Sequence, residues 1–146
     1  MVILTSFKNI GDFDGKKFSV ARWQPKGFNI WALDFLAAEG AGGVELHLRD
    51  FKDPLKEFAA AYREGLKERW SKVETWLGEI DPEESIVLAC WCPYSKATQE
   101  QMSRFGSFCC HTGLIGRLVQ KFRPDVDVVM DSDRLNYLVK EWRPNE

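Results

Sequence analysis

Residues 86–92 read IVLACWC, and this short stretch decides the fold. It is a continuous apolar run that opens with two β-branched residues, which is typical of a strand buried on both faces of a sheet. Three further β-rich runs occur elsewhere in the chain: VILTSF (2–7), FSVAR (18–22) and VDVVMD (126–131). We therefore expect residues 86–92 to form the central strand of a sheet.

Helical patterns fill the intervals between these runs. Asp53-Pro54 combines a residue that caps helices well with a proline suited to the first helical position, so a helix should start there. Ser71 and Glu74 have the spacing of a capping box, which predicts a second helix or a bend running to about Ile80. Further helices are expected at 95–105, 108–122 and 134–142, with a short helix or turn at 29–40 and an extended segment at 44–50.

Strands that alternate with helices along the chain favour a sheet whose strands run parallel, because each helix carries the chain back to the same edge. The length of 146 residues is enough for one domain with a substantial hydrophobic core. The sequence therefore predicts a single α/β domain over residues 1–146, with a mostly parallel sheet flanked by helices in three layers.

The charge balance limits the partners that the protein can attract. Lys and Arg number 20 and Asp and Glu number 22, so non-specific binding of duplex DNA is not favoured. A local basic groove with Trp23, Trp31 or Trp91 for base stacking stays open. The longest apolar runs have only the length of a strand, and the N-terminus lacks the pattern of a secretion signal. We expect a cytoplasmic protein that does not enter the membrane.

Polar residues follow several of the expected strands. Thr5-Ser6 ends the first strand, Arg22 ends the second, and Cys90 lies near the end of the central one. The carboxyl ends of parallel strands share one edge of the sheet, and ligands of open α/β sheets bind there. We expect these residues to meet, with Arg22 holding an anionic group such as a phosphate.

All four cysteines of the chain and one of its two histidines fall within residues 90–113. If Ser107 caps the expected helix at 108–122, Cys110 and His111 lie in its first turn. The positive potential there favours a thiolate and attracts anions. In the thiol interpretation, Cys110 or Cys90 is a nucleophile assisted by His111.

Two other interpretations of the cysteine stretch stay open. In a cytoplasmic protein, cysteines are more often thiols or metal ligands than disulfides, so a zinc site is conceivable. The spacing of the candidate ligands along the chain differs from the ligand spacing of ordinary zinc ribbons and fingers. The third interpretation is simple core packing, because free cysteine is among the most buried residue types. The zinc ligands would come from Cys90, Cys92, Cys109, Cys110 and His111.

Several short motifs occur in one order along the chain. The first is a strand ending in Thr5-Ser6 with Phe7 beside it, and the last is Cys110-His111 at the start of a helix. Between them come Ser19, Arg22 and Pro25, the helix positions Tyr62 and Leu66, and the apolar strand Ile86–Cys90. In this ordered series the chain resembles the domain of unknown function 488 family.

The resemblance implies a small α/β protein in a family without a settled biochemical activity. It also singles out Cys90, Cys110 and His111, because they match family positions. The chain departs from the family signature at two places: Thr112 stands where the family has arginine, and Cys92 stands where it often has glutamate. Chemistry that depends on that arginine therefore does not transfer directly to this chain.

The sequence predicts a small enzyme-like domain that binds a phosphate-bearing or nucleotide-like ligand. The alternative is a non-catalytic binding module, either zinc-stabilised or nucleic-acid-binding. No resident cofactor is predicted, with zinc left open. The candidate catalytic residues are Cys110, His111 and Cys90, and the candidate ligand-binding residues are Thr5, Ser6 and Arg22.

Overall fold

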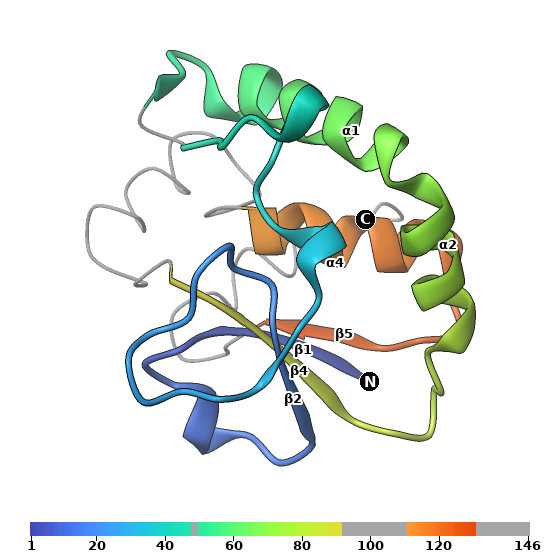
Figure 1. Ribbon diagram of the computed structural model, residues 1–146. Helices are drawn as coiled ribbons and strands as arrows, with labels where there is room; N and C mark the ends of the chain where they lie inside the picture. Colours follow the sequence, from blue (N-terminus) through green and yellow to red (C-terminus); the bar gives the residue numbers. More distant parts are fainter. Residues whose placement is uncertain (48–49, 92–110, 131–146) are drawn as a thin grey trace.

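The computed structural model describes residues 1–47, 50–91 and 111–130 (Figure 1). Its centre is a sheet of five strands in the order β3-β2-β4-β1-β5. Every pair of neighbouring strands is parallel, so the predicted α/β fold with a parallel sheet is confirmed. The strands are β1 (Val2–Ser6), β2 (Lys16–Ser19), β3 (Trp31–Ala32), β4 (Ile86–Cys90) and β5 (Val128–Met130).

Strand β4 lies in the middle of the sheet, between β1 and β2, as the apolar run predicts. Val87, Leu88 and Ala89 are fully buried, because each face of the strand is covered and both edges are paired. The strand ends at Cys90, two residues earlier than expected, and Trp91 turns away into solvent with 53% of its surface exposed.

The described helices lie on one side of the sheet, and the short turn η1 (Ile10–Asp12) lies on the other (Figure 1). The connections from β3 to β4 and from β4 to β5 run in the same direction across the sheet. Right-handed crossovers place such connections on the same face. The connection from β1 to β2 runs the opposite way and so covers the opposite face. The helices are η5 (Pro54–Phe58, a π-helical turn), α1 (Ala59–Glu68), α2 (Trp70–Glu79) and α4 (His111–Phe122).

The predicted helix start at Asp53-Pro54 is confirmed. A carboxylate oxygen of Asp53 accepts a hydrogen bond from the backbone N–H of Lys56 at 3.2 Å, which satisfies one of the free N–H groups of the first turn. The capping box predicted at Ser71 is wrong. Helix α2 begins at Trp70, and the carboxylate of Glu74 accepts a hydrogen bond from the Trp70 indole instead of capping the backbone.

Residues 29–40 form a two-residue strand, β3, followed by the 3-10 turn η2 (Asp34–Leu36). Pairing of Trp31 with Phe18 of β2 holds the backbone extended where the sequence suggested a short helix or turn. The turn η3 (Ala41–Gly43) comes next. In the extended segment expected at 44–50, the described residues 44–47 and 50 join no strand of the sheet, although Glu45 forms an isolated antiparallel bridge with Glu39.

The second strand also differs from its prediction. It covers Lys16–Ser19 rather than residues 18–22, because β4 ends at Cys90 and offers no further ladder partner. Arg22 therefore lies in the loop after the strand.

Some of the predicted features lie outside the described residues. They are the helices expected at 95–105 and 134–142 and the residues Cys92, Cys109 and Cys110. Within the described residues, no helix has the length and apolarity needed to span a bilayer.

Arg123 ties the C-terminal end of α4 to α2. Its guanidinium donates hydrogen bonds to the two carboxylate oxygens of Asp125 at 2.9 and 2.8 Å, and to the carbonyl of Leu77 at 2.6 Å. The hydrogen bond between the two side chains lowers the pKa of Asp125 and raises the pKa of Arg123. These contacts fix one end of α4, and His111 lies at the opposite end.

Candidate functional site

Buried polar side chains gather at one end of the sheet. Five such residues occur in the described part of the chain, each at most 5% exposed, and we call them the buried polar row. All five lie at the carboxyl ends of strands or in the first turn of α4. Open α/β sheets bind their ligands at this edge. The row consists of Thr5 and Ser6 at the end of β1, Ser19 at the end of β2, and His111 and Thr112 at the start of α4.

The two central strands end side by side. Ser6 is the register partner of Cys90, so both side chains leave the same face of the sheet. The turn η1, which follows β1, lies on one face of the sheet, and α4, the next described element after β4, lies on the other. Neighbouring strands whose connections depart to opposite faces open a crevice between them, and this crevice is the usual ligand position in such folds.

The hydroxyl of Ser6 is buried and has no hydrogen-bond partner among the described residues. Most buried polar atoms in proteins have a partner, and leaving one without costs about 1–3 kcal/mol. Ser19 is different, because its hydroxyl accepts a hydrogen bond from the backbone N–H of Ala21 at 3.2 Å. The Ser19 hydroxyl therefore holds the loop, whereas the Ser6 hydroxyl makes no such contact with the described residues.

His111 is held in one orientation. Its Nε2 atom lies 2.7 Å from the carbonyl oxygen of Val20. A carbonyl only accepts hydrogen bonds, so Nε2 carries a proton, and Nδ1 of the neutral ring is the atom that can accept one. The ring packs edge-on against Tyr62, with centroids 5.7 Å apart, and the Tyr62 hydroxyl donates to the carbonyl of Leu36 at 2.7 Å.

Tyr62 has a role that the sequence did not reveal. In the sequence it was only one of the helix positions that carry the resemblance to the family. In the structure it is 1% exposed and orients the ring of His111 from α1. Only the contact between α1 and α4 creates this role, and helical spacing carries no information about that contact.

Cys90 lies beside Ser6 but is 1% exposed. A thiol at this depth is shielded from reagents in bulk solvent. Cys110, the other candidate nucleophile, lies outside the described residues. Within the described residues, no three His, Cys, Asp or Glu side chains are grouped to hold a metal ion. The zinc hypothesis depends on cysteines outside that part and stays a prediction.

Arg22 lies at the same edge of the sheet, but two carboxylates surround it. Its Nη1 atom is 3.7 Å from a carboxylate oxygen of Glu39 and 3.9 Å from one of Glu45. These partners offset its positive charge, which reduces the attraction that Arg22 exerts on an anion. Thr5, Ser6 and His111 are therefore buried at this end of the sheet, with Thr5 and Ser6 on opposite faces of β1, and Arg22 lies in a separate ionic cluster.

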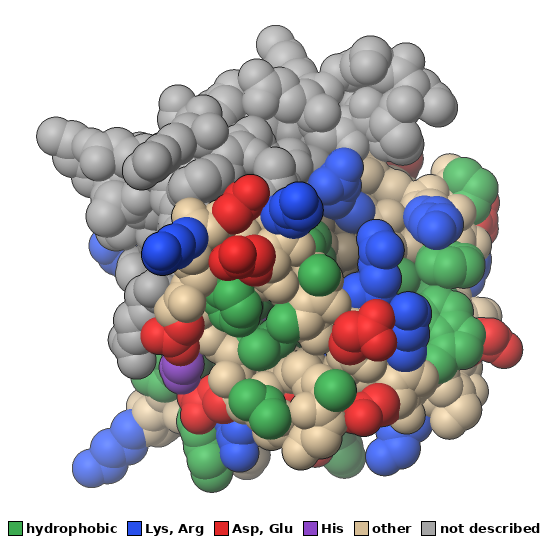
Figure 2. Space-filling model, turned by 90° about the horizontal axis from the view of Figure 1, so that it is seen from above, with side chains coloured by type: hydrophobic (Ala, Val, Ile, Leu, Met, Phe, Trp, Pro, Cys, Tyr) green, Lys and Arg blue, Asp and Glu red, His purple; other side chains and the backbone are tan. Residues whose placement is uncertain are grey.

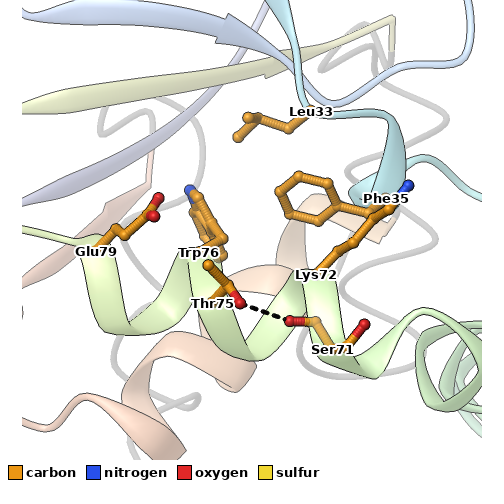
Figure 3. Close-up of a pocket in the computed structure, with 7 residues that line it drawn as sticks. All are labelled: Leu33, Phe35, Ser71, Lys72, Thr75, Trp76 and Glu79. Atoms are coloured by element: carbon orange, nitrogen blue, oxygen red, sulfur yellow. Dashed lines mark hydrogen bonds between the residues drawn. The ribbon is translucent and has the colours of Figure 1, made fainter.

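An open pocket of about 390 Å³ lies between α2 and the segment after β3 (Figure 3). Its apolar part is formed by Leu33, Phe35 and Trp76, and Lys72 and Glu79 lie at its edge. None of the lining residues belongs to the buried polar row. The pocket is therefore separate from the carboxyl ends of β1 and β4.

Comparison with known proteins found no matching family model, no similar curated protein and no similar solved structure. The resemblance to the domain of unknown function 488 family therefore stays a prediction from the sequence.

Proposed function

We propose that this protein binds a small phosphate-bearing or nucleotide-like ligand in the crevice at the carboxyl ends of β1 and β4. One observation carries the proposal: the buried polar side chains of the described residues gather at this edge, and the Ser6 hydroxyl among them has no partner. A protein that maintains an unsatisfied buried hydroxyl at a ligand-binding edge gains a hydrogen bond when a ligand arrives.

The surroundings of the crevice suit an anionic group. The described part of α4 begins at His111, and the amino end of a helix offers backbone N–H groups and positive potential to an anion. The buried polar row contains hydroxyl groups and an imidazole but no carboxylate, so it holds no like charge to repel a phosphate. Arg22 adds to binding only when a ligand replaces its contacts with Glu39 and Glu45.

His111 is the group best placed for proton transfer. Because Val20 fixes the proton on Nε2, the Nδ1 atom is the candidate general base. In this proposal it takes a proton from a ligand hydroxyl or from a cysteine thiol, and the resulting oxygen or sulfur atom becomes the nucleophile. Cys90 and Cys110 are the candidate thiols.

A nucleic-acid-binding module is less well supported. Figure 2 shows Lys and Arg side chains interspersed with Asp and Glu on the face seen from above. Affinity for a nucleic-acid backbone grows with the number of phosphates that cationic side chains neutralise, and mixed charges on one face weaken that term. The small-ligand proposal does not depend on such a surface.

We expect Ser6→Ala to stabilise the ligand-free protein by about 1 kcal/mol and to weaken ligand binding about tenfold. The substitution removes a buried hydroxyl that has no partner, and it also removes the hydrogen bond that the ligand would receive. Chemical denaturation measures the first effect. Calorimetric titration with AMP, ribose 5-phosphate and inorganic phosphate measures the second.

Ser19→Ala is the matched control. It also removes a buried serine hydroxyl at the end of a strand, but one that already serves Ala21. This variant should lose about 1 kcal/mol of stability, and its affinity for the same ligands should change far less. If Ser6→Ala destabilises the fold as Ser19→Ala does and leaves binding intact, the proposed site is wrong.

A further inference from the structure

Four aromatic side chains lie on the loops that follow β1, β2 and β4, and we call them the aromatic rim. They are Phe7, Trp23, Phe28 and Trp91. Trp23 is 69% exposed, Trp91 53% and Phe28 38%. Large exposed aromatic side chains that gather in one place mark a binding surface, since a soluble protein gains nothing by leaving them in water.

The aromatic rim is ordered. Phe7 is 6% exposed, and its ring centroid lies 5.4 Å from that of Phe28 and 5.6 Å from that of Trp91. The Trp91 ring meets Phe7 edge-on, at an interplanar angle of 76°. The Trp91 indole N–H donates a hydrogen bond to the carbonyl of Trp23. Trp91 is thus fixed in position while half of its surface stays exposed, and this arrangement lowers the entropy cost of stacking another ring on it.

The aromatic rim continues directly into the proposed ligand site. Phe7 follows Ser6 in the chain, and Trp91 follows Cys90. Ser6 and Cys90 are register partners at the ends of the two central strands. The exposed ring of Trp91 therefore lies one residue beyond the end of the strand that pairs with Ser6.

The charges around the aromatic rim favour a ring that carries a negative group. Lys26 lies between Trp23 and Phe28 in the chain, and Lys8 follows Phe7. Lys8 and Lys26 are exposed, and neither pairs with a carboxylate of the described residues. Their charges are available to a phosphate.

We propose that the aromatic rim is the base-binding subsite for a mononucleotide, with the base stacked on Trp91 and the phosphate toward Ser6 and the first turn of α4. This inference rests on the proposed function and deepens it by assigning the ring of the ligand. A mononucleotide is favoured over single-stranded nucleic acid because acidic residues outnumber basic ones, 22 to 20, and a long phosphate backbone requires the opposite balance.

The test compares AMP with ribose 5-phosphate, which has the same phosphate and sugar but no base. The intact protein should bind AMP about tenfold more tightly, because one base–aromatic stack contributes at least that factor. Trp91→Leu should abolish this difference and leave the affinity for ribose 5-phosphate unchanged. Trp91→Phe, which keeps a ring, should retain part of it. Trp31→Leu is the control, since Trp31 is 81% exposed on the edge strand β3 and lies outside the aromatic rim.

Circular dichroism confirms that each variant is folded before titration. Equal affinities of the intact protein for AMP and ribose 5-phosphate would overturn the base-binding subsite and leave the proposed function standing. Absence of binding to both compounds would overturn the subsite and the proposed function together. Binding of a short single-stranded oligonucleotide tenfold more tightly than AMP would overturn the mononucleotide as the occupant. An equal loss of AMP affinity in Trp31→Leu and Trp91→Leu would overturn the assignment to Trp91.

Discussion

Replacing Gly65 by alanine should lower the free energy of unfolding by about 3 kcal/mol, and denaturation in urea will measure the change. A Cβ atom at Gly65 would lie 2.0 Å from the carbonyl oxygen of Glu39 and 2.9 Å from a guanidinium nitrogen of Arg69. The nearer atom belongs to the backbone, so α1 and the segment after η2 must separate. Alanine ordinarily gains about 1 kcal/mol over glycine inside a helix, but this clash outweighs that gain.

Separating Gly65 from the carbonyl of Glu39 costs further free energy, because the hydrogen bonds of Arg69 hold the two segments together. Its guanidinium donates hydrogen bonds to the carbonyl oxygens of Phe35, Ala37 and Glu39 at 3.0, 3.4 and 3.1 Å. Moving α1 away from Glu39 would stretch these charge-assisted bonds, each of which contributes more than a neutral one. Glu39 is also an ionic partner of Arg22, so the same displacement would alter the cluster beside the ligand edge.

Gly78→Ala provides the matched control. Gly78 lies in α2, and a Cβ atom there would meet nothing within 4 Å. Since only helix propensity acts at this position, the substitution should stabilise the protein by roughly 0.5–1 kcal/mol. Equal effects of the two substitutions would show that the close approach at Gly65 does not constrain the fold.

The sequence predicted those parts of the fold that local chemistry determines. Residues 86–90 form the central strand because every residue is apolar, and Asp53 starts a helix because its carboxylate reaches a free backbone N–H. The short helix or turn predicted at 29–40 is confirmed only in part, because η2 occupies Asp34–Leu36 but Trp31–Ala32 forms the strand β3. The conformation of residues 29–40 depends on the pairing of Trp31 with Phe18 and on the hydrogen bonds from Arg69. Both of these partners, Phe18 and Arg69, lie outside the segment.

In the candidate site, too, some features follow from the local sequence and others depend on contacts between distant residues. Parallel strands end at one edge, so the sequence could predict that Ser6 and Cys90 lie together. It could not predict the ionic partners of Arg22, because Glu39 and Glu45 approach it only through the folded course of the loop after η2. The anion-binding role predicted for Arg22 assumed a free guanidinium, and the charge of a side chain can be judged only with its partners in place.

We expect His111→Ala to lower the free energy of unfolding by about 2–3 kcal/mol, whereas His111→Gln should lower it by less than about 1 kcal/mol. Alanine removes the hydrogen bond to the carbonyl of Val20, a fully buried residue, and also the packing against Tyr62. The amide nitrogen of glutamine can occupy nearly the position of histidine Nε2 and donate to the same carbonyl. Thermal and urea denaturation will compare the two variants.

The glutamine variant separates a positioning role of His111 from a chemical one. Glutamine keeps the donor toward Val20 but lacks the proton acceptor at the position of Nδ1. If Nδ1 takes a proton from a cysteine thiol, iodoacetamide should modify that cysteine at pH 7 at least tenfold more slowly in His111→Gln than in the unmodified sequence. Peptide mapping by mass spectrometry identifies which cysteine has reacted, and denatured protein gives the reference rate for each thiol. A glutamine variant that is stable and alkylated at the original rate would assign His111 to structure alone, since the donor to Val20 would then account for everything that the histidine does.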